Sequence, residues 1–185
     1  MRVLRDVELA WNGHENCGHF GGFGMVELHA SSGHRLFAVK RALCESHRSS
    51  ILNEFKMRKA LGSHANVITF LSLKRARLPY IIMEFAENGD LDAFVRIVGI
   101  PDSSLAKALF RQLLEGLRFV HSHSVAHFDI RPANLLLFDG GKTLKIADFG
   151  LACHYRQKNK EILFRGSRGD REFMAPEILD GRMYR

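Results

Sequence analysis

The chain has 185 residues, of which 46% are hydrophobic and 25% charged, and its formal net charge is +7. This composition is typical of a globular chain and excludes a disordered or fibrous protein. No apolar run reaches membrane-spanning length, so we expect no membrane segment. The basic residues are scattered, with short clusters such as 74–77, which favours a solvated basic surface over a nucleic-acid site.

The first residues and the cysteines indicate a compartment. Residues 1–6 lack the continuous apolar core of a signal peptide, and Cys17, Cys44 and Cys153 form no paired framework. Because disulfides are rare in reducing compartments, we expect a cytoplasmic or nuclear protein without them.

The first half of the chain predicts a small sheet with one helix. Glycines at 18–24 lie in a turn between two strands that run to about residue 39. A helix is expected at about 49–61, and strands are expected at 67–73 and 80–85.

The second half predicts a long helix and then a hairpin. Asp102, between Pro101 and Ser103, is a helix-start signal, and apolar residues recur at helical spacing as far as His121. This stripe is expected to be core and comprises Leu105, Leu109, Leu113, Leu117 and Val120. Short strands at 135–138 and 144–146 enclose a tight turn, which should bring Asn134 near Asp148.

Five short motifs occur in a fixed order along the chain. They are HFGGFGMV at 19–26, FAVK at 37–40, HFDIRPAN at 127–134, DFG at 148–150 and MAPE at 174–177. Aspartate and asparagine are common turn and cap residues, so any one motif is a weak signal. The order of all five resembles eukaryotic protein kinases. Pro132, DFGLA and NLLL are similar to serine/threonine kinases of the checkpoint or calmodulin-dependent type.

The resemblance implies an α+β, bilobal, protein-kinase-like fold. Residues 1–86 would form an N-lobe with a small antiparallel sheet and one helix. Residues 87–185 would form an incomplete helical C-lobe, because a kinase normally continues for several helices past its A-P-E motif. We therefore expect a shortened relative or a fragment, with a partner protein over the apolar surface that the missing helices would cover.

The resemblance also implies roles in phosphoryl transfer from ATP to a protein serine or threonine. Asp129 would orient and deprotonate the hydroxyl, while Asn134 and Asp148 would hold Mg²⁺. Lys40 would hold the α- and β-phosphates. Arg131 stands where serine/threonine kinases place a lysine, and would contact phosphate with a planar fork.

A further set of residues would bind the nucleotide. The hinge at 84–86 would pair with adenine, Met83 would be the gatekeeper, Leu136 the floor and Asp90 a ribose contact. Ordinary core packing is the alternative for Met83 and Leu136. The full set is Gly18, His19, Gly21, Gly22, Gly24, Val26, Ala38, Lys40, Glu54, Met83, Glu84, Ala86, Asp90 and Leu136.

Glu54 has two interpretations. The resemblance makes it the ion-pair partner that positions Lys40. The alternative is an exposed i,i+4 pair with Arg58, a residue that stands where kinases usually pack an apolar side chain.

Several residues depart from the kinase pattern. Phe128 replaces the arginine that pairs with a phosphorylated activation loop, so activation by loop phosphorylation is not expected. His19 replaces the first glycine of the loop, and Asp170 replaces a threonine, which adds a carboxylate near Asp129. The alternatives are therefore a catalytically impaired pseudokinase, acting as a nucleotide-binding or scaffold module, and a defective paralogue that does not fold stably alone.

The histidines at 121, 123 and 127 suggest a zinc site by their spacing. They lack the cysteine or carboxylate companions of a usual site, and the end of a helix explains their position. We therefore expect no zinc at this cluster.

Overall fold

The computed structural model describes residues 19–21, 24–31, 33–157, 160–166 and 168–184. Gly18 and Gly22 of the predicted glycine-rich loop therefore lie outside the described residues. The chain divides into two compact units, which are described separately below. Unit 1 comprises Met1–Leu52 and Thr69–Phe85, and unit 2 comprises Asn53–Ile68 and Ala86–Arg185. The lobes predicted at 1–86 and 87–185 stay a prediction.

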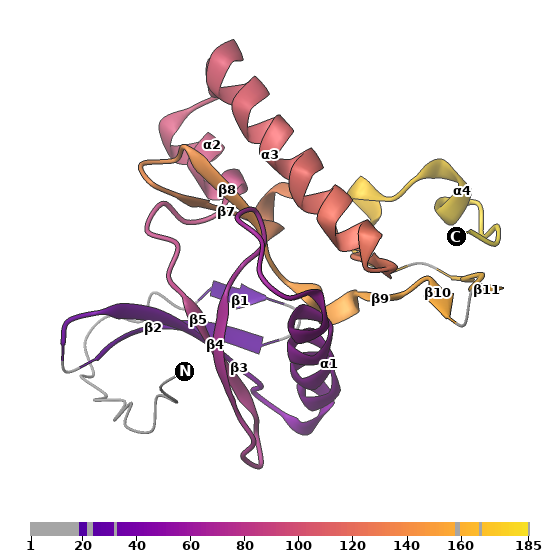
Figure 1. Ribbon diagram of the computed structural model, residues 1–185, viewed down its shortest axis with the longest axis horizontal. Helices are drawn as coiled ribbons and strands as arrows, with labels where there is room; N and C mark the ends of the chain where they lie inside the picture. The colour runs from indigo at the N-terminus through magenta and orange to yellow at the C-terminus, as the bar shows by residue number, and fades with distance from the viewer. Residues whose placement is uncertain (1–18, 22–23, 32, 158–159, 167, 185) are drawn as a thin grey trace. The chain divides into compact units, whose positions relative to one another are not determined.

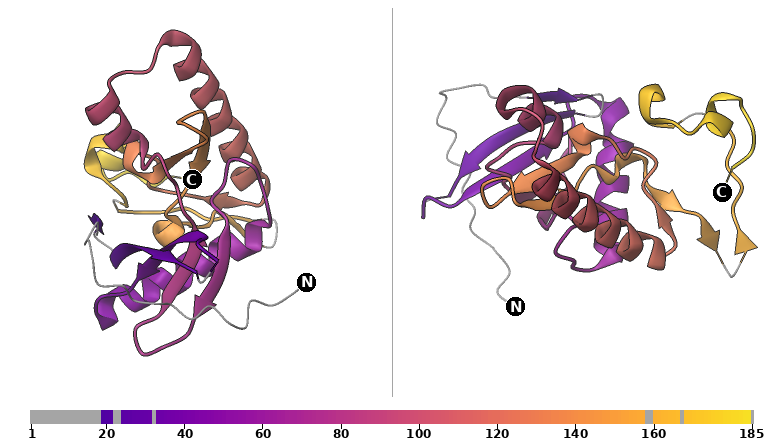
Figure 2. Two further views of the ribbon diagram at one scale, coloured as in Figure 1. Left: turned by 90° about the vertical axis from the view of Figure 1, so that its left-hand side faces the viewer. Right: turned by 90° about the horizontal axis from the view of Figure 1, so that it is seen from above.

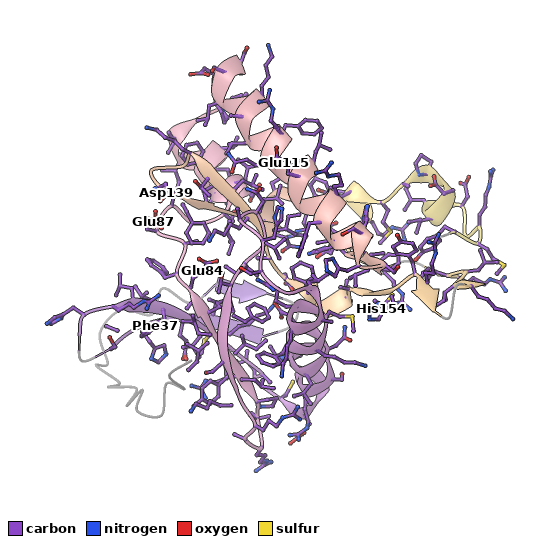
Figure 3. The ribbon with its side chains drawn as sticks, viewed as in Figure 1. Phe37, Glu84, Glu87, Glu115, Asp139 and His154 are labelled. Carbon is purple, nitrogen blue, oxygen red and sulfur yellow. The ribbon has the colours of Figure 1, made fainter. Side chains whose placement is uncertain are left out.

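Unit 1 is built on a five-stranded antiparallel sheet with the order β1-β2-β3-β5-β4 (Figure 1). Its strands are β1 (His19–Gly21), β2 (Gly24–Ala30), β3 (Leu36–Arg41), β4 (Phe70–Lys74) and β5 (Tyr80–Glu84). Phe37, Val39 and Ile82 form a buried cluster, against which Leu71 and Tyr80 pack. Figure 3 labels Phe37 and Glu84, which are paired in the ladder between β3 and β5. Burial of the cluster holds β3 and β5 at the centre of the sheet.

Strand β4 begins three residues later than predicted, at Phe70 rather than 67. Val67 and Ile68 are instead fully buried within unit 2. Val67 forms a parallel bridge with Ile146, and the Ile68 N–H donates to the Ile146 carbonyl over 2.9 Å. These contacts turn the backbone away from the β4 ladder, so the prediction of a strand from 67 is wrong at its start.

Helix α1 (Glu45–Leu61) begins earlier than the predicted start at 49 and contributes residues to both units. Glu45 in its first turn and Arg58 in its last turn complement the helix dipole. Glu54 is 1% exposed and Arg58 is 5% exposed. The Arg58 guanidinium donates to the carbonyls of Gly62 and Ile68. The predicted alternative of an exposed Glu54–Arg58 pair is therefore wrong, because both side chains are buried.

Two helices of unit 2 are capped by aspartates. Helix α3 (Ser103–Ser122) begins where predicted, since Asp102 Oδ1 accepts from the N–H groups of Ser104 and Leu105 at 2.8 and 2.9 Å. Helix α2 (Leu91–Val98) was not predicted, and Asp90 Oδ1 caps it by accepting from the Ala93 N–H at 2.8 Å. The apolar stripe of α3 is buried at Leu109 and Val120 and half-buried at Leu105, Leu113 and Leu117.

The predicted hairpin is formed by β7 (Leu135–Phe138) and β8 (Thr143–Ile146), with α3 lying along β8 (Figures 1 and 2). Buried Asn66 joins the two elements. Its amide donates to Gln112 Oε1 of α3 and to the Leu144 carbonyl of β8, at 3.1 and 2.9 Å. Glu87 and Asp139, both labelled in Figure 3, are joined where the Glu87 carboxylate accepts the Asp139 N–H at 2.5 Å.

The rest of unit 2 consists of short elements. They are β6 (Val125–Ala126), β9 (Cys153–His154), β10 (Arg156–Gln157), β11 (Lys160–Glu161), helix α4 (Pro176–Leu179), and the 3₁₀ helices η1 (Pro132–Asn134), η2 (Phe149–Leu151) and η3 (Arg171–Phe173). Strand β6 pairs with β9, and β10 pairs with β11. Figures 1 and 2 place β10 and β11 at the opposite end of unit 2 from α2.

The α+β, kinase-like fold class is confirmed, with an antiparallel-sheet N-lobe and a helical C-lobe. In the part of the chain that the structure describes, no helix has the length and apolar character needed to cross a membrane.

We expect Asn66→Ala to destabilise unit 2. It would leave the buried Leu144 carbonyl without its side-chain donor, at a cost of about 1–3 kcal/mol in the free energy of unfolding. Thermal and urea denaturation would measure the loss. Glu115→Ala on the exposed face of α3 is the matched control (Figure 3) and should change stability little. Equal melting temperatures for Asn66→Ala and wild type would contradict this role.

Candidate active site

The imidazole of His127 fixes the loop at 127–134. His127 is buried, its Nε2 lies 2.8 Å from the Ala147 carbonyl oxygen, and its Nδ1 accepts the Asp129 N–H at 3.2 Å. A carbonyl oxygen only accepts and an amide N–H only donates, so these partners require the neutral Nε2–H tautomer. Backbone groups thus engage both ring nitrogens, which agrees with the expectation that His127 is not a zinc ligand.

The Asp129 carboxylate is held on both oxygens. Oδ2 accepts from Asn134 Nδ2 at 2.8 Å, and Oδ1 accepts from the Asp170 N–H at 3.0 Å. Asn134 Nδ2 also donates to the Asp129 carbonyl at 2.7 Å. These contacts from two segments restrict the rotation of the carboxylate. The direction of the Asp129 carboxylate is therefore fixed by its neighbours.

Asn134 and Asp148 supply oxygen atoms next to this loop. As predicted, the hairpin brings them near one another, because the Ala147 N–H donates to the Asn134 carbonyl at 2.9 Å. The Asn134 amide nitrogen faces two acceptors on Asp129, so its side-chain oxygen is directed away from them. Asp148 has a left-handed backbone (φ 59°), and its Oδ1 accepts the Gly150 N–H at 3.3 Å.

The donor set at this position suits Mg²⁺. An amide oxygen and a carboxylate are hard ligands, which Mg²⁺ prefers, and Mg²⁺ takes its other ligands from water and phosphate. Among the residues that the structure describes, no group of three or more histidine, cysteine, aspartate or glutamate side chains could hold a metal. The amide oxygen of Asn134 and the carboxylate of Asp148 thus fit the donor chemistry of Mg²⁺.

Asn53 ties helix α1 to the segment that follows Asp148. Its side-chain amide donates to the carbonyls of Gly150 and Ala152, both at 3.0 Å. Phe149 is fully buried, and its ring packs edge-on against His127 with the centroids 4.8 Å apart. Asn53 was not predicted as a site residue, because a polar residue inside a helix gives no sequence signal for a distant partner.

Arg131 is engaged by the carboxylate that replaces a threonine. Its Nη1 forms an ion pair with Asp170 Oδ2, and both side chains are half-buried. The other oxygen of Asp170 accepts the Glu172 N–H at 3.2 Å, which caps η3. Arg131 therefore neutralises the carboxylate that lies beside Asp129.

Gly169 lets the two segments come close. Its φ is +84°, and a Cβ there would lie 2.8 Å from Asp129 Oδ1 and would overlap the Phe128 carbonyl oxygen. A side chain is excluded both by this backbone conformation and by the contact. Gly169 was not predicted as a site residue.

In unit 1, the residues assigned to nucleotide binding lie on the sheet. Lys40 is buried on β3, between Val26 of β2 and Ile81 of β5 in the ladder. Ala38 and Met83 are buried and directly opposite one another. His19 pairs with Val26 and Gly21 with Gly24 in the antiparallel ladder of β1 and β2.

Packing against β3 explains why position 24 is a glycine. A Cβ there would overlap the Arg41 carbonyl oxygen, and its φ is +147°. Glu84 at the end of β5 is braced by Thr69: its N–H donates to the Thr69 carbonyl at 3.1 Å, and its carboxylate accepts the Thr69 N–H at 2.7 Å. Both residues thus have structural roles whether or not a nucleotide binds.

In unit 2, the remaining residues of this set surround the start of α2. The Ala86 carbonyl accepts the Gly89 N–H at 3.1 Å, and Asp90 forms an antiparallel bridge with Leu136. Asp90 already caps α2 through Oδ1, so a ribose contact would share this carboxylate. Leu136 is half-buried between buried neighbours, Leu135 and Leu137, which is consistent with a side chain on the opposite face of β7.

The two described cysteines are expected to differ in reactivity. The Ser46 hydroxyl, 2.9 Å from the Cys44 sulfur, lowers the pKa of that exposed thiol. Burial raises the pKa of the Cys153 thiol, and nearby Arg168 opposes this shift more weakly. Because the thiolate is the reactive form, iodoacetamide at about pH 8 should modify Cys44 faster than Cys153, and the difference should narrow as pH rises. Mass spectrometry of tryptic peptides measures both rates, and equal rates at that pH would contradict the assignment.

Comparison with known proteins agrees with this geometry. Residues 13–185 match the model of the protein kinase domain. The chain is 35% identical to the serine/threonine-protein kinase chk1 of Schizosaccharomyces pombe over 170 residues, covering 85% of this chain and 34% of the relative. It is 38% identical to chk-1 of Caenorhabditis elegans over 143 residues, covering 74% of this chain and 27% of the relative.

A further relative is mitogen-activated protein kinase kinase kinase 7 of Drosophila melanogaster, with 35% identity over 176 residues that cover 92% of this chain and 25% of the relative. The chain thus spans about a third or less of the length of these relatives. The family match extends over most of the chain and includes every motif around Asp129, Asn134 and Asp148. The chain belongs to the protein kinase domain family.

Proposed function

We propose that this chain transfers the γ-phosphoryl group of ATP to serine or threonine hydroxyls of proteins. The observation that carries the proposal is the Asp129 carboxylate, held by the Asn134 amide and the Asp170 N–H. Asn134 is in turn joined through its carbonyl to Ala147, the residue before Asp148. One base and two oxygen ligands are thereby held by a continuous hydrogen-bonded framework. The names of the relatives support the serine/threonine class.

Asp129 would orient the substrate hydroxyl and accept its proton. Its two hydrogen bonds fix the direction of the carboxylate before substrate arrives, which avoids an entropic cost during the reaction. Asn134 and Asp148 would hold Mg²⁺. This ion, when bound, would neutralise charge on the phosphates.

Nucleotide binding is proposed for the residues that the family pattern assigns. Lys40 would contact the α- and β-phosphates, and its burial on β3 limits the directions in which its ammonium can point. The set comprises Gly18, His19, Gly21, Gly22, Gly24, Val26, Ala38, Glu54, Met83, Glu84, Ala86, Asp90 and Leu136. Protein kinases generally use ATP with Mg²⁺, which supports both cofactors here.

A partner protein over the helical lobe is also proposed. Phe110 and Leu114 on α3 are 60% and 51% exposed, which supports an apolar contact surface on this helix.

Cys44 and Cys153 are free thiols, in keeping with the expected cytoplasmic or nuclear location.

Asp129→Asn tests the proposed reaction. The amide cannot accept the hydroxyl proton as the carboxylate does, so radiolabelled phosphate transfer from Mg²⁺-ATP to a generic basic peptide should fall by about 100-fold or more. Asp139→Asn makes the same chemical change at an exposed left-handed position in the β7–β8 turn, and should leave activity unchanged. Equal activity in wild type and Asp129→Asn would refute the proposed base.

The second candidate function is a pseudokinase that binds nucleotide without turnover. It is favoured by the ion pair between Arg131 and Asp170, because a guanidinium bound to a carboxylate is less available to a transferred phosphate. Phe128, in place of an arginine, also favours it. Asp129, Asn134 and Asp148 remain in place, so we rank this function second.

A thermal-shift measurement tests nucleotide binding apart from turnover. Ligand bound only by the folded chain raises its melting temperature, so Mg²⁺-ATP should give a concentration-dependent rise. Lys40→Met should reduce this rise, because it removes the cation proposed to hold the phosphates. Lys107→Met, at an exposed lysine on α3 outside the proposed nucleotide site, is the control. A rise as large in Lys40→Met as in wild type would remove Lys40 from the site.

A further inference from the structure

Three aromatic rings meet beside the proposed base. Phe128 packs edge-on against Phe164, with centroids 4.9 Å apart, and against Tyr184 at 6.0 Å. Phe164 and Tyr184 are also 6.0 Å apart. The Arg168 guanidinium lies over the Phe128 and Phe164 rings at 5.5 and 5.4 Å. We call these four residues, Phe128, Phe164, Arg168 and Tyr184, the aromatic clasp.

Backbone hydrogen bonds join two members of the clasp, Phe164 and Tyr184. Phe164 and Tyr184 form an antiparallel bridge, with N–H to carbonyl distances of 2.8 and 3.0 Å. The Tyr184 hydroxyl donates to the Gly166 carbonyl at 3.0 Å. Phe164 is buried, unlike its exposed neighbour Leu163. Main-chain hydrogen bonds and ring contacts therefore both hold the segment around 164–166 against Tyr184.

The clasp is in register with the contacts on Asp129. The Phe128 side chain meets Arg168, the Phe128 carbonyl meets Gly169, and the Asp129 carboxylate meets the N–H of the next residue, Asp170. Consecutive residues of one segment thus face consecutive residues of the other. Any slippage that separates Phe128 from Arg168 would also move the amide that orients Asp129.

The backbone conformation of Phe128 indicates that the contacts of its side chain hold it in place. Its φ is +67°, a conformation that a bulky side chain rarely adopts. Such a conformation persists only where surrounding contacts over-determine it. The two ring contacts and the stacked guanidinium supply those contacts.

We propose that Phe128, Arg168 and Tyr184 are positioning residues for phosphoryl transfer, which hold the 164–170 segment against Asp129 without a phosphate on that segment. This inference rests on the proposed kinase function. The clasp contains its own cation, already placed over two rings, and its remaining members are aromatic rings. An added anion is therefore not needed to bring the segments together, whereas an arginine at position 128 would need one.

Steady-state kinetics and hydrogen exchange test the clasp together. Phe128→Leu keeps apolar bulk but removes the ring, and Arg168→Met removes the stacked cation. Each should lower kcat by about tenfold or more, while KM for ATP changes little, because positioning of the base is lost and nucleotide contacts are not. Phe128→Tyr keeps the ring and should retain most of the activity. Ile100→Ala, at an exposed apolar residue after α2 and outside the clasp, should behave as wild type.

Amide hydrogen exchange of peptides covering 164–174 gives a readout that needs no activity. Exchange should speed up there in Phe128→Leu and Arg168→Met, and it should stay at the wild-type rate in Phe128→Tyr and Ile100→Ala. Treatment of active wild-type protein with a broad phosphatase should leave kcat unchanged.

The outcomes separate the clasp from the function on which it rests. Unchanged kcat in Phe128→Leu and Arg168→Met, with an active wild type, would overturn the clasp, as would loss of activity on phosphatase treatment. A wild type that transfers no phosphate to any peptide would overturn the proposed function. Slow exchange at 164–174 in that wild type, accelerated by Phe128→Leu, would still support the ordering of the segment by the clasp.

Discussion

The active-site half of this molecule depends on one imidazole that bridges two backbone segments. His127 joins the carbonyl before Asp148 to the N–H of Asp129, so the proposed base and a proposed metal ligand are positioned through a single buried ring. Both bonds are to backbone atoms, which do not vary with side-chain identity. The loop keeps these two backbone contacts although Phe128 and Arg131, both after His127, depart from the family pattern. The substitutions change the side chains that contact the loop.

Those changes place a cation beside each altered position. Asp170 places a carboxylate beside Asp129, and Arg131 neutralises it with a planar guanidinium. Phe128 removes a cation from the loop, and Arg168 brings one back from the facing segment, over the face of the ring. In the second case a cation near the loop is kept while its source moves. In the first case Arg131 takes the place of another cation, so it pairs with the added carboxylate without adding a positive charge. An altered motif in a sequence is therefore a poor measure of an altered electrostatic environment.

Much of the fold was predictable because its signals are local. The cap at Asp102, the glycine turn between 135–138 and 144–146, and the alternation in the sheet each depend on neighbouring residues. The start of β4 and the burial of Arg58 were not predictable, since both depend on distant partners at Ile146 and Ile68. Around Asp129, the motif residues were identified by family resemblance, whereas Asn53, Gly169 and the clasp were missed. Their contacts join positions tens of residues apart, and no spacing rule records such contacts.

The contacts of Arg58 have a consequence for how this sequence can evolve. Its buried guanidinium binds the carbonyls at both ends of the connection from Gly62 to Ile68. Replacement by leucine, which suits a core helix, would leave two carbonyls without their donor, so the intermediate sequence would be less stable than either end state. Exchange of this arginine for an apolar residue therefore requires a coordinated second change in the connection. In this lineage, the 62–68 connection and position 58 are expected to vary together.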